Sequence, residues 1–152
     1  MATKLKLILS ICLLFVVFYF GSIALKDDDS EIVKAFQSLN EPFKEIAHIE
    51  MLDNTKSIVF YESTFGDIEV FGNVRLKKNI FGWRMLSSGS SQTPQKYKLG
   101  WHFSNLAFDF HTYTDLIFGK IYDSNIEEVV IVTKNHKKYH AEIIEYGSGK
   151  RF

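Results

Sequence analysis

Residues 68–80 read IEVFGNVRLKKNI, and apolar side chains alternate with polar ones along this run. Apolar residues at positions 68, 70, 74, 76 and 80 share one parity, and polar residues at positions 69, 73, 75 and 77 share the other. Successive side chains of a strand point to opposite faces of a sheet, so this pattern predicts a half-buried antiparallel strand. Its phase breaks either at Gly72, as a bulge, or at Lys78-Asn79, as a hairpin turn.

Shorter runs on both sides also carry the composition and alternation of strands. They are residues 43–51, 57–63, 80–86, 97–106, 116–122, 127–134 and 139–146. The continuous apolar run Val129–Val132 predicts a central strand covered on both faces, and residues 139–146 are its predicted hairpin partner across Asn135-His136-Lys137. Residues 87–95 hold no apolar side chain and predict an exposed, mobile loop, and residues 147–150 predict a flexible tail.

A short amphipathic helix is predicted before the first strand. Apolar residues at positions 32, 33, 36 and 39 form one helical stripe, Asp29 or Ser30 can cap its first turn, and Pro42 ends it. The expected fold class is therefore mainly β (α+β), with an N-terminal transmembrane helix, this short helix, and an antiparallel β-sandwich or partly open barrel of about eight strands. We expect three parts of the chain: a membrane anchor or signal segment at residues 1–26, a linker with the short helix at residues 27–42, and an extracytoplasmic β-rich domain at residues 43–152.

The N-terminal segment predicts a membrane anchor. Residues 7–25 form an unbroken apolar run preceded by Lys4 and Lys6. As a helix this run would span about 28 Å, close to the ~30 Å hydrocarbon thickness of a bilayer. Cations on its N-terminal side favour a cytoplasmic N-terminus, so we expect a single-pass protein of the cell membrane with residues 43–152 in an extracytoplasmic domain.

A cleaved secretory signal is the alternative interpretation of the same segment. Ser22-Ile23-Ala24 is a small-x-small tripeptide, and cleavage after Ala24 would release a secreted domain. The apolar run is longer than the usual signal-peptide core, which favours the retained anchor. In both interpretations the remainder of the chain crosses the membrane.

Cysteine content and charge exclude several classes of function for the exported part. The only cysteine, Cys12, lies in the apolar run, so the domain can form no disulfide and has no thiol nucleophile or Cys-based zinc site. All eighteen acidic residues but only fifteen of the eighteen basic ones follow residue 26, and the resulting mild negative charge argues against nucleic-acid binding.

Two sets of residues are candidate binding surfaces. Arg75, Lys77 and Arg84 form a local basic group that could hold an anion or a lipid headgroup. Trp101 and Tyr113 belong to a segment dense in aromatic residues, which either builds the core or presents a binding patch. Ordinary solvated strand faces and core packing are the alternatives for these two sets.

A metal-dependent hydrolase is the competing hypothesis from another class of function. Its candidate ligands are His102, Asp109, His111 and His140, because imidazole and carboxylate groups bind zinc. Their spacing matches no known type of site, and His136 and His140 flank a predicted turn rather than sharing a helix face. No catalytic motif occurs in the chain, and the sequence implies no cofactor.

Three segments carry a resemblance to a protein group. They are Ile58-Val59-Phe60-Tyr61, VRLKKNIFGW at residues 74–83, and Gly119-Lys120-Ile121-Tyr122-Asp123. Together with the Lys-flanked span, they resemble small single-span extracytoplasmic proteins of Bacillus-type Gram-positive bacteria. The resemblance covers most of the chain, implies an exported domain behind one span, and supplies no catalytic residues.

The function expected from the sequence is a membrane-tethered extracytoplasmic binding module with no evident catalytic activity. It would contact the membrane through residues 7–25 and bind an unknown protein or envelope component. An immunity-type protein that intercepts a toxin at the membrane is a further alternative, which size and topology permit.

Overall fold

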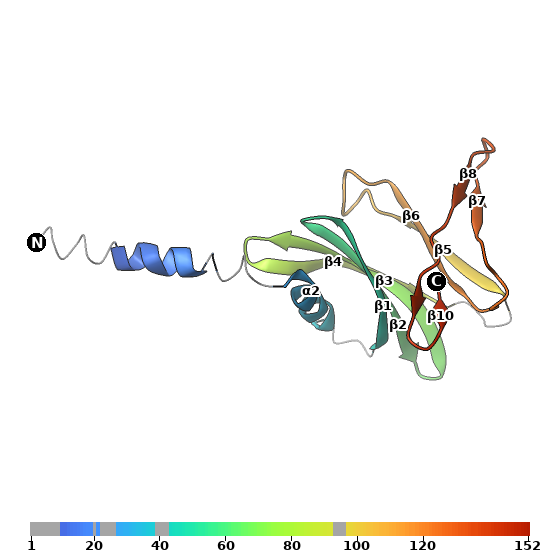
Figure 1. The fold of residues 1–152 in the computed structure, drawn as a ribbon, viewed down its shortest axis with the longest axis horizontal. Helices are drawn as coiled ribbons and strands as arrows, with labels where there is room; N and C mark the ends of the chain where they lie inside the picture. The colour runs from blue at the N-terminus through green and yellow to red at the C-terminus, as the bar shows by residue number, and fades with distance from the viewer. Residues whose placement is uncertain (1–9, 20, 22–26, 39–42, 93–96) are drawn as a thin grey trace, which may run out of the picture.

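The computed structural model describes residues 10–19, 21, 27–38, 43–92 and 97–152. These residues form a mainly β fold with two helices and ten antiparallel strands (Figure 1). The predicted β-rich class is confirmed, with two more strands in the described residues than the approximate count expected.

The first sheet is a four-stranded meander in the order β1-β2-β3-β4. Its strands are β1 (Phe43–Asp53), β2 (Lys56–Phe65), β3 (Ile68–Asn79) and β4 (Gly82–Ser91). Strands β2 and β3 pair without interruption, so there is no bulge between them at Gly72, and the chain turns after Asn79. A shift in register between β3 and β4 falls instead between Arg75 and Leu76.

The predicted loop over residues 87–95 is wrong for its first half. Residues 87–91 belong to β4, and Ser88 lies opposite Val74. The long edge of β3 offers backbone partners to this polar segment, and backbone pairing does not require apolar side chains. Residues 93–96 lie outside the described part of the chain.

Helix α2 (Asp28–Gln37) covers one face of the first sheet. Asp27 caps it by accepting a hydrogen bond from the Ser30 amide at 3.4 Å, so the cap lies ahead of the two predicted candidates. Ile32 and Phe36 are buried in a core with residues of β2, β3 and β4. The predicted helix and its packing against the sheet are therefore confirmed.

The second sheet packs on the opposite face of the first. Its order is β5-β6-β10-β9, formed by β5 (Leu99–Asn105), β6 (Asp115–Ile121), β9 (Glu145–Tyr146) and β10 (Lys150–Arg151). A second core joins the two sheets, with Phe60 and Phe71 from the first sheet and Phe110 and Tyr146 from the second half of the chain.

Strands β7 (Val130–Val132) and β8 (Lys138–His140) form a separate two-stranded ribbon (Figure 1). The predicted hairpin turn is confirmed, with His136 at a φ of 60°. The prediction of a buried central strand over residues 127–134 is wrong, because β7 has three residues and the side chain of Val132 is 57% exposed. Residues 129 and 131 are half-buried and residues 130 and 132 are exposed, so neither face of this apolar run is fully covered.

The prediction of a flexible tail over residues 147–150 is also wrong. Gly147 and Gly149 both have positive φ and turn the chain between β9 and β10. Strand β10 then lies inside the sheet between β9 and β6, and the Lys150 ammonium contacts Glu62 of β2 at 2.6 Å. Long-range pairing orders a segment whose local composition is that of a loop.

The N-terminal segment is described only in part. Residues 10–19 are helical, and apolar side chains such as Leu14, Phe15 and Phe18 are 68–77% exposed. Among the residues that the structure describes, no helix is both long enough and apolar enough to cross a bilayer. The predicted span also includes residues 7–9, 20 and 22–25, which lie outside the described part.

Candidate binding groove

An apolar groove of about 610 Å³ opens beside strand β6. Residues 116–119 of β6 line one side, and residues 129–132 and 141–144 line the other. Three aromatic residues also line the groove, namely Phe60 of β2, Trp101 of β5 and Phe152. The groove has the size and the largely apolar surface typical of binding sites.

Strand pairing positions the β6 side of the groove. In the β5–β6 ladder Trp101 lies opposite Gly119, and Phe103 lies opposite Ile117. A Cβ atom on Gly119 would overlap the carbonyl oxygen of Gly100 and lie 2.9 Å from Cα of Trp101. The absence of a side chain at Gly119 therefore allows β5 and β6 to approach closely at the groove.

Several apolar side chains on this side of the molecule are exposed to solvent. Trp101 is 66% exposed, Phe103 58%, Ile117 41% and Val132 57%. Trp101, Ile117 and Val132 line the groove, and Phe103 lies beside Ile117 in the ladder. Contiguous exposed apolar surface of this kind marks interaction sites more often than ordinary protein surface.

The titratable side chains of the groove lining are His48, Glu50 and Glu142. His48 Nε2 lies 3.0 Å from a carboxylate oxygen of Glu50, and the imidazole ring also lies near Phe60 and Phe152. The described lining contains no lysine or arginine. The groove thus favours neutral or cationic groups over anions.

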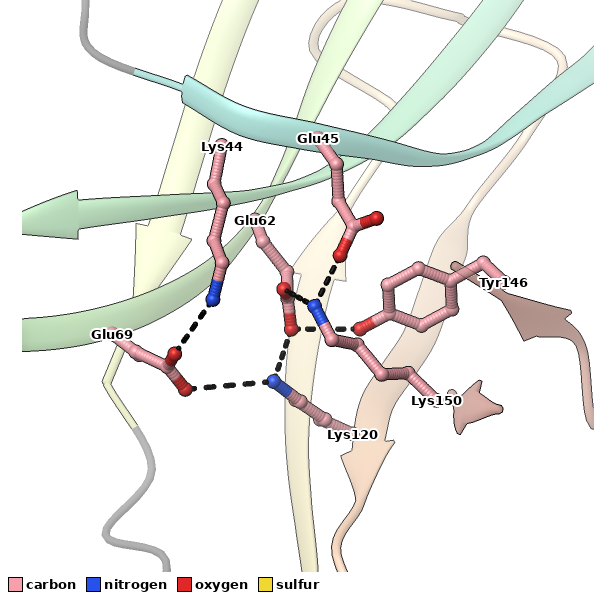
Figure 2. A network of polar contacts seen from close by, with 7 residues as sticks. All are labelled: Lys44, Glu45, Glu62, Glu69, Lys120, Tyr146 and Lys150. Atoms are coloured by element: carbon pink, nitrogen blue, oxygen red, sulfur yellow. Dashed lines mark hydrogen bonds and ion pairs between the residues drawn. The ribbon is translucent and has the colours of Figure 1, made fainter. Parts of the chain in front are cut away.

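Next to the groove, a polar network joins the two sheets (Figure 2). Glu62 of β2 is buried, with its side chain 3% exposed, and accepts hydrogen bonds from Lys120 of β6, Tyr146 of β9 and Lys150 of β10. The Tyr146 hydroxyl donates at 2.9 Å and the Lys150 ammonium at 2.6 Å. Lys150 also pairs with Glu45 of β1.

Electrostatics keep this network charged. Burial alone would raise the pKa of Glu62, but hydrogen bonds from Lys120, Lys150 and Tyr146 outweigh it and lower the pKa to about 2. Burial and the hydrogen bond to Glu62 raise the pKa of Tyr146, which keeps the phenol neutral. Lys120, Tyr146 and Lys150 all donate hydrogen bonds to the carboxylate of Glu62. The network therefore holds the two sheets together and does not present a reactive group.

The predicted basic group does not form a single free surface. Arg75 forms an ion pair with Asp109 at 2.5 Å and a hydrogen bond with Ser104, and its side chain is only 13% exposed. Lys77 and Arg84 are exposed and lie directly opposite each other on β3 and β4. Arg75 thus ties β3 to the segment after β5, while the other two remain a candidate anion surface.

The two aromatic candidates have different environments. Trp101 lines the groove and is largely exposed. Tyr113 is half-buried against the second core, and its hydroxyl donates a hydrogen bond to the Leu52 carbonyl at 2.9 Å. The structure thus places one of the pair at the groove and gives the other a packing role.

The candidate metal ligands are not brought together. Asp109 is bound by Arg75 and Ser87, and Nδ1 of His140, at the end of β8, lies 2.6 Å from a carboxylate oxygen of Glu128. His102 packs against Phe118, and burial lowers the pKa of its imidazole. His111 is exposed in the segment between β5 and β6. Within the described residues, no three His, Cys, Asp or Glu side chains are placed to hold a metal ion.

Comparisons of the chain with protein-family models, curated proteins and solved structures found no match.

Sequence reasoning missed most of the groove and all of the Glu62 network. The apolar run at residues 129–132 was the available signal for the groove, because a strand-like apolar segment must be covered or remain a contact surface. The signal for the network was Glu62 itself, a carboxylate that directly follows four apolar residues in a predicted strand. Its partners lie 58–88 residues further along the chain, beyond any local pattern.

Proposed function

We propose that this protein is a membrane-tethered extracytoplasmic binding module without catalytic activity, and that the groove beside β6 takes its protein or envelope partner. The groove carries the proposal, because its apolar lining is open to solvent and includes the exposed side chains of Trp101 and Ile117. The Glu62 network next to it supports a binding role, since it holds the two sheets in a fixed relation.

The membrane tether is supported by residues 7–25 and by the apolar side chains exposed along the helical residues 10–19. Water disfavours this amount of apolar helical surface, and lipid favours it. Cations before the run support a cytoplasmic N-terminus with the β-rich domain on the far side. Fusions of alkaline phosphatase and of a cytosol-active fluorescent protein to the C-terminus test this orientation. We expect activity only from the phosphatase, and the reverse result would exclude an exported domain.

Photo-crosslinking in intact cells tests the binding role. A photoreactive amino acid replaces Trp101 or Ile117 at the groove, and Phe108, which is 86% exposed and outside the groove lining, provides the matched control. We expect a discrete adduct from the groove positions and none from position 108. Absence of groove adducts, or the same adducts from all three positions, would reject the groove as the binding site.

A further inference from the structure

The second sheet has an interior position that its own strands fill only in part. β10 lies between β6 and β9, yet it has two residues, whereas β6 has seven. β10 pairs with β6 only through Arg151 and Ile121. On the other side Phe152 exchanges backbone hydrogen bonds of 3.0 and 3.1 Å with Ile144.

Beyond this point no described strand lies between residues 116–119 of β6 and residues 141–144. Residues 116–119 of β6 and residues 141–144, which lead into β9, line the same groove. Strands two positions apart in a sheet are separated by about 9–10 Å, twice the usual strand spacing. Because β6 and β9 lie on either side of β10, a strand that continued β10 would enter the groove between residues 116–119 and residues 141–144, and we call this space the slot.

The backbone of β6 points into this slot. Strand β6 pairs with β5 along residues 115–121, so roughly half of its amide and carbonyl groups face β5 and the rest face the opposite edge. On that edge only Ile121 has a partner strand among the described residues. Backbone polar groups beside an apolar lining gain most from a partner that supplies hydrogen bonds as well as apolar contacts.

We propose that an extended segment of a partner polypeptide adds to the second sheet as a strand between β6 and residues 141–144. This inference rests on the proposed role of the groove as the binding site. The segment runs antiparallel to β6, as β10 does, and main-chain hydrogen bonds on its two edges supply much of the affinity. A small apolar ligand would fill the same volume but leave those backbone groups without partners.

The lining also defines the side chains of this segment. One face of the inserted strand meets Phe60 and Phe118 between the two sheets, and the other meets Trp101 and Ile117 toward solvent. Glu50 and Glu142 favour lysine or arginine at the remaining positions, where an aliphatic stem can lie along apolar surface. The fitting sequence therefore has apolar residues at alternate positions, is uncharged or basic, and covers about six residues, the length of the open edge of β6.

The test fills the slot with a tethered strand. The polypeptide of residues 1–152 is extended after Phe152 by Thr-Val-Thr-Val-Thr-Val, which continues β10, and a matched extension Thr-Pro-Thr-Pro-Thr-Pro lacks alternate amide donors and resists strand pairing. Hydrogen exchange is measured at the amides of residues 116–119. We expect the valine extension to slow exchange by roughly tenfold relative to the proline extension. Exchange in β2 and β3 serves as the control for folding and should be the same in both proteins.

The same two extended chains are then used in the crosslinking experiment at position 117. The valine extension should abolish the adduct formed in cells, and the proline extension should leave it in place. Equal exchange rates in the two chains would show that the slot does not accept a strand, which overturns the inference. Slower exchange with an undiminished adduct would show that the partner binds otherwise, which overturns strand insertion but leaves the proposed function. Loss of adducts at groove positions even in the unextended chain would instead reject the proposed function.

Discussion

The two four-stranded sheets differ in how completely their interior positions are filled. In the first sheet the interior strands β2 and β3 have ten and twelve residues, and they pair with each other along ten positions. In the second sheet the interior strand β10 has two residues beside a β6 of seven. We infer that the first sheet, with α2 on it, provides most of the stability, and that the second sheet keeps backbone edges and apolar surface for a partner.

The strongest way to break this comparison is to remove a large side chain from the core of the first sheet. Phe36→Ala in α2 deletes a ring that is 1% exposed, and we expect the free energy of unfolding to fall by about 3–5 kcal/mol. Phe108→Ala removes the same group at 86% exposure and should change stability by less than about 0.5 kcal/mol. Urea denaturation measures the free energy of unfolding of both variants. Equal losses would show that the core under α2 is not the main source of stability.

The contact between the sheets is the next largest contribution we expect. Glu62→Ala leaves the ammonium groups of Lys120 and Lys150 without their buried partner, so unfolding free energy should fall by about 3 kcal/mol. Glu69→Ala removes a carboxylate that is 39% exposed and should cost under about 1 kcal/mol. A loss at Glu62 no greater than at Glu69 would mean that the network does not hold the sheets together.

Acid should weaken the same contact without any substitution. The pKa of Glu62 is lowered from its usual 4.5 to about 2, so the folded state binds its proton less readily than the unfolded state does. The stabilisation is fully present above about pH 5 and is lost as the pH falls from there toward 2. Unfolding midpoints in urea between pH 6 and 2.5 should therefore drop less steeply in Glu62→Gln than in the natural chain. Parallel pH profiles for the two proteins would contradict the assigned pKa.

A glycine pair compares the backbones of the two sheets. Gly119→Ala in β6 places a Cβ atom against the backbone of β5, and we expect a loss of about 1–3 kcal/mol. Gly89→Ala in β4 has no atom within 4 Å of the added Cβ and should be neutral or slightly stabilising. Thermal unfolding followed by circular dichroism compares them. Equal midpoints for the two variants would show that β5 and β6 move apart at little cost to accommodate the added Cβ atom.

The difference between the sheets also decides what the sequence could predict. The strands of the first sheet are long, and they either alternate in polarity, as β3 does, or hold a run of β-branched and aromatic residues, as β2 does, so local pattern predicted them to within a few residues. Strand β10 has two residues and is held by Glu62, 88 residues earlier in the chain, so no local pattern reveals it. Residues 129–132 were misassigned because a continuous apolar run predicts burial, whereas here it lines an open groove.

The candidate site divides in the same way. Trp101 could be found from its aromatic segment, since aromatic residues suit both cores and contact surfaces. Arg75 was a reasonable candidate by charge, but the sequence cannot show that Asp109, which lies 34 residues away, neutralises it. A groove between β6 and residues 141–144 exists only through tertiary arrangement, because its two sides come from segments with no shared pattern.

The smallest expected effect on stability comes from the residue that should matter most for binding. Trp101→Ala removes a side chain that is 66% exposed, so unfolding free energy should change by no more than about 0.5 kcal/mol. The same substitution deletes the largest exposed apolar surface at the groove, and aromatic anchors of this kind often contribute 2 kcal/mol or more to binding, roughly a thirtyfold change in affinity. Adduct yield from a photoreactive group at position 117 should therefore fall sharply in a chain that unfolds at the natural midpoint. A large loss of stability would instead show that the Trp101 side chain belongs to the core. The second sheet would then contribute to stability as the first sheet does, and the contrast between the two sheets would fail.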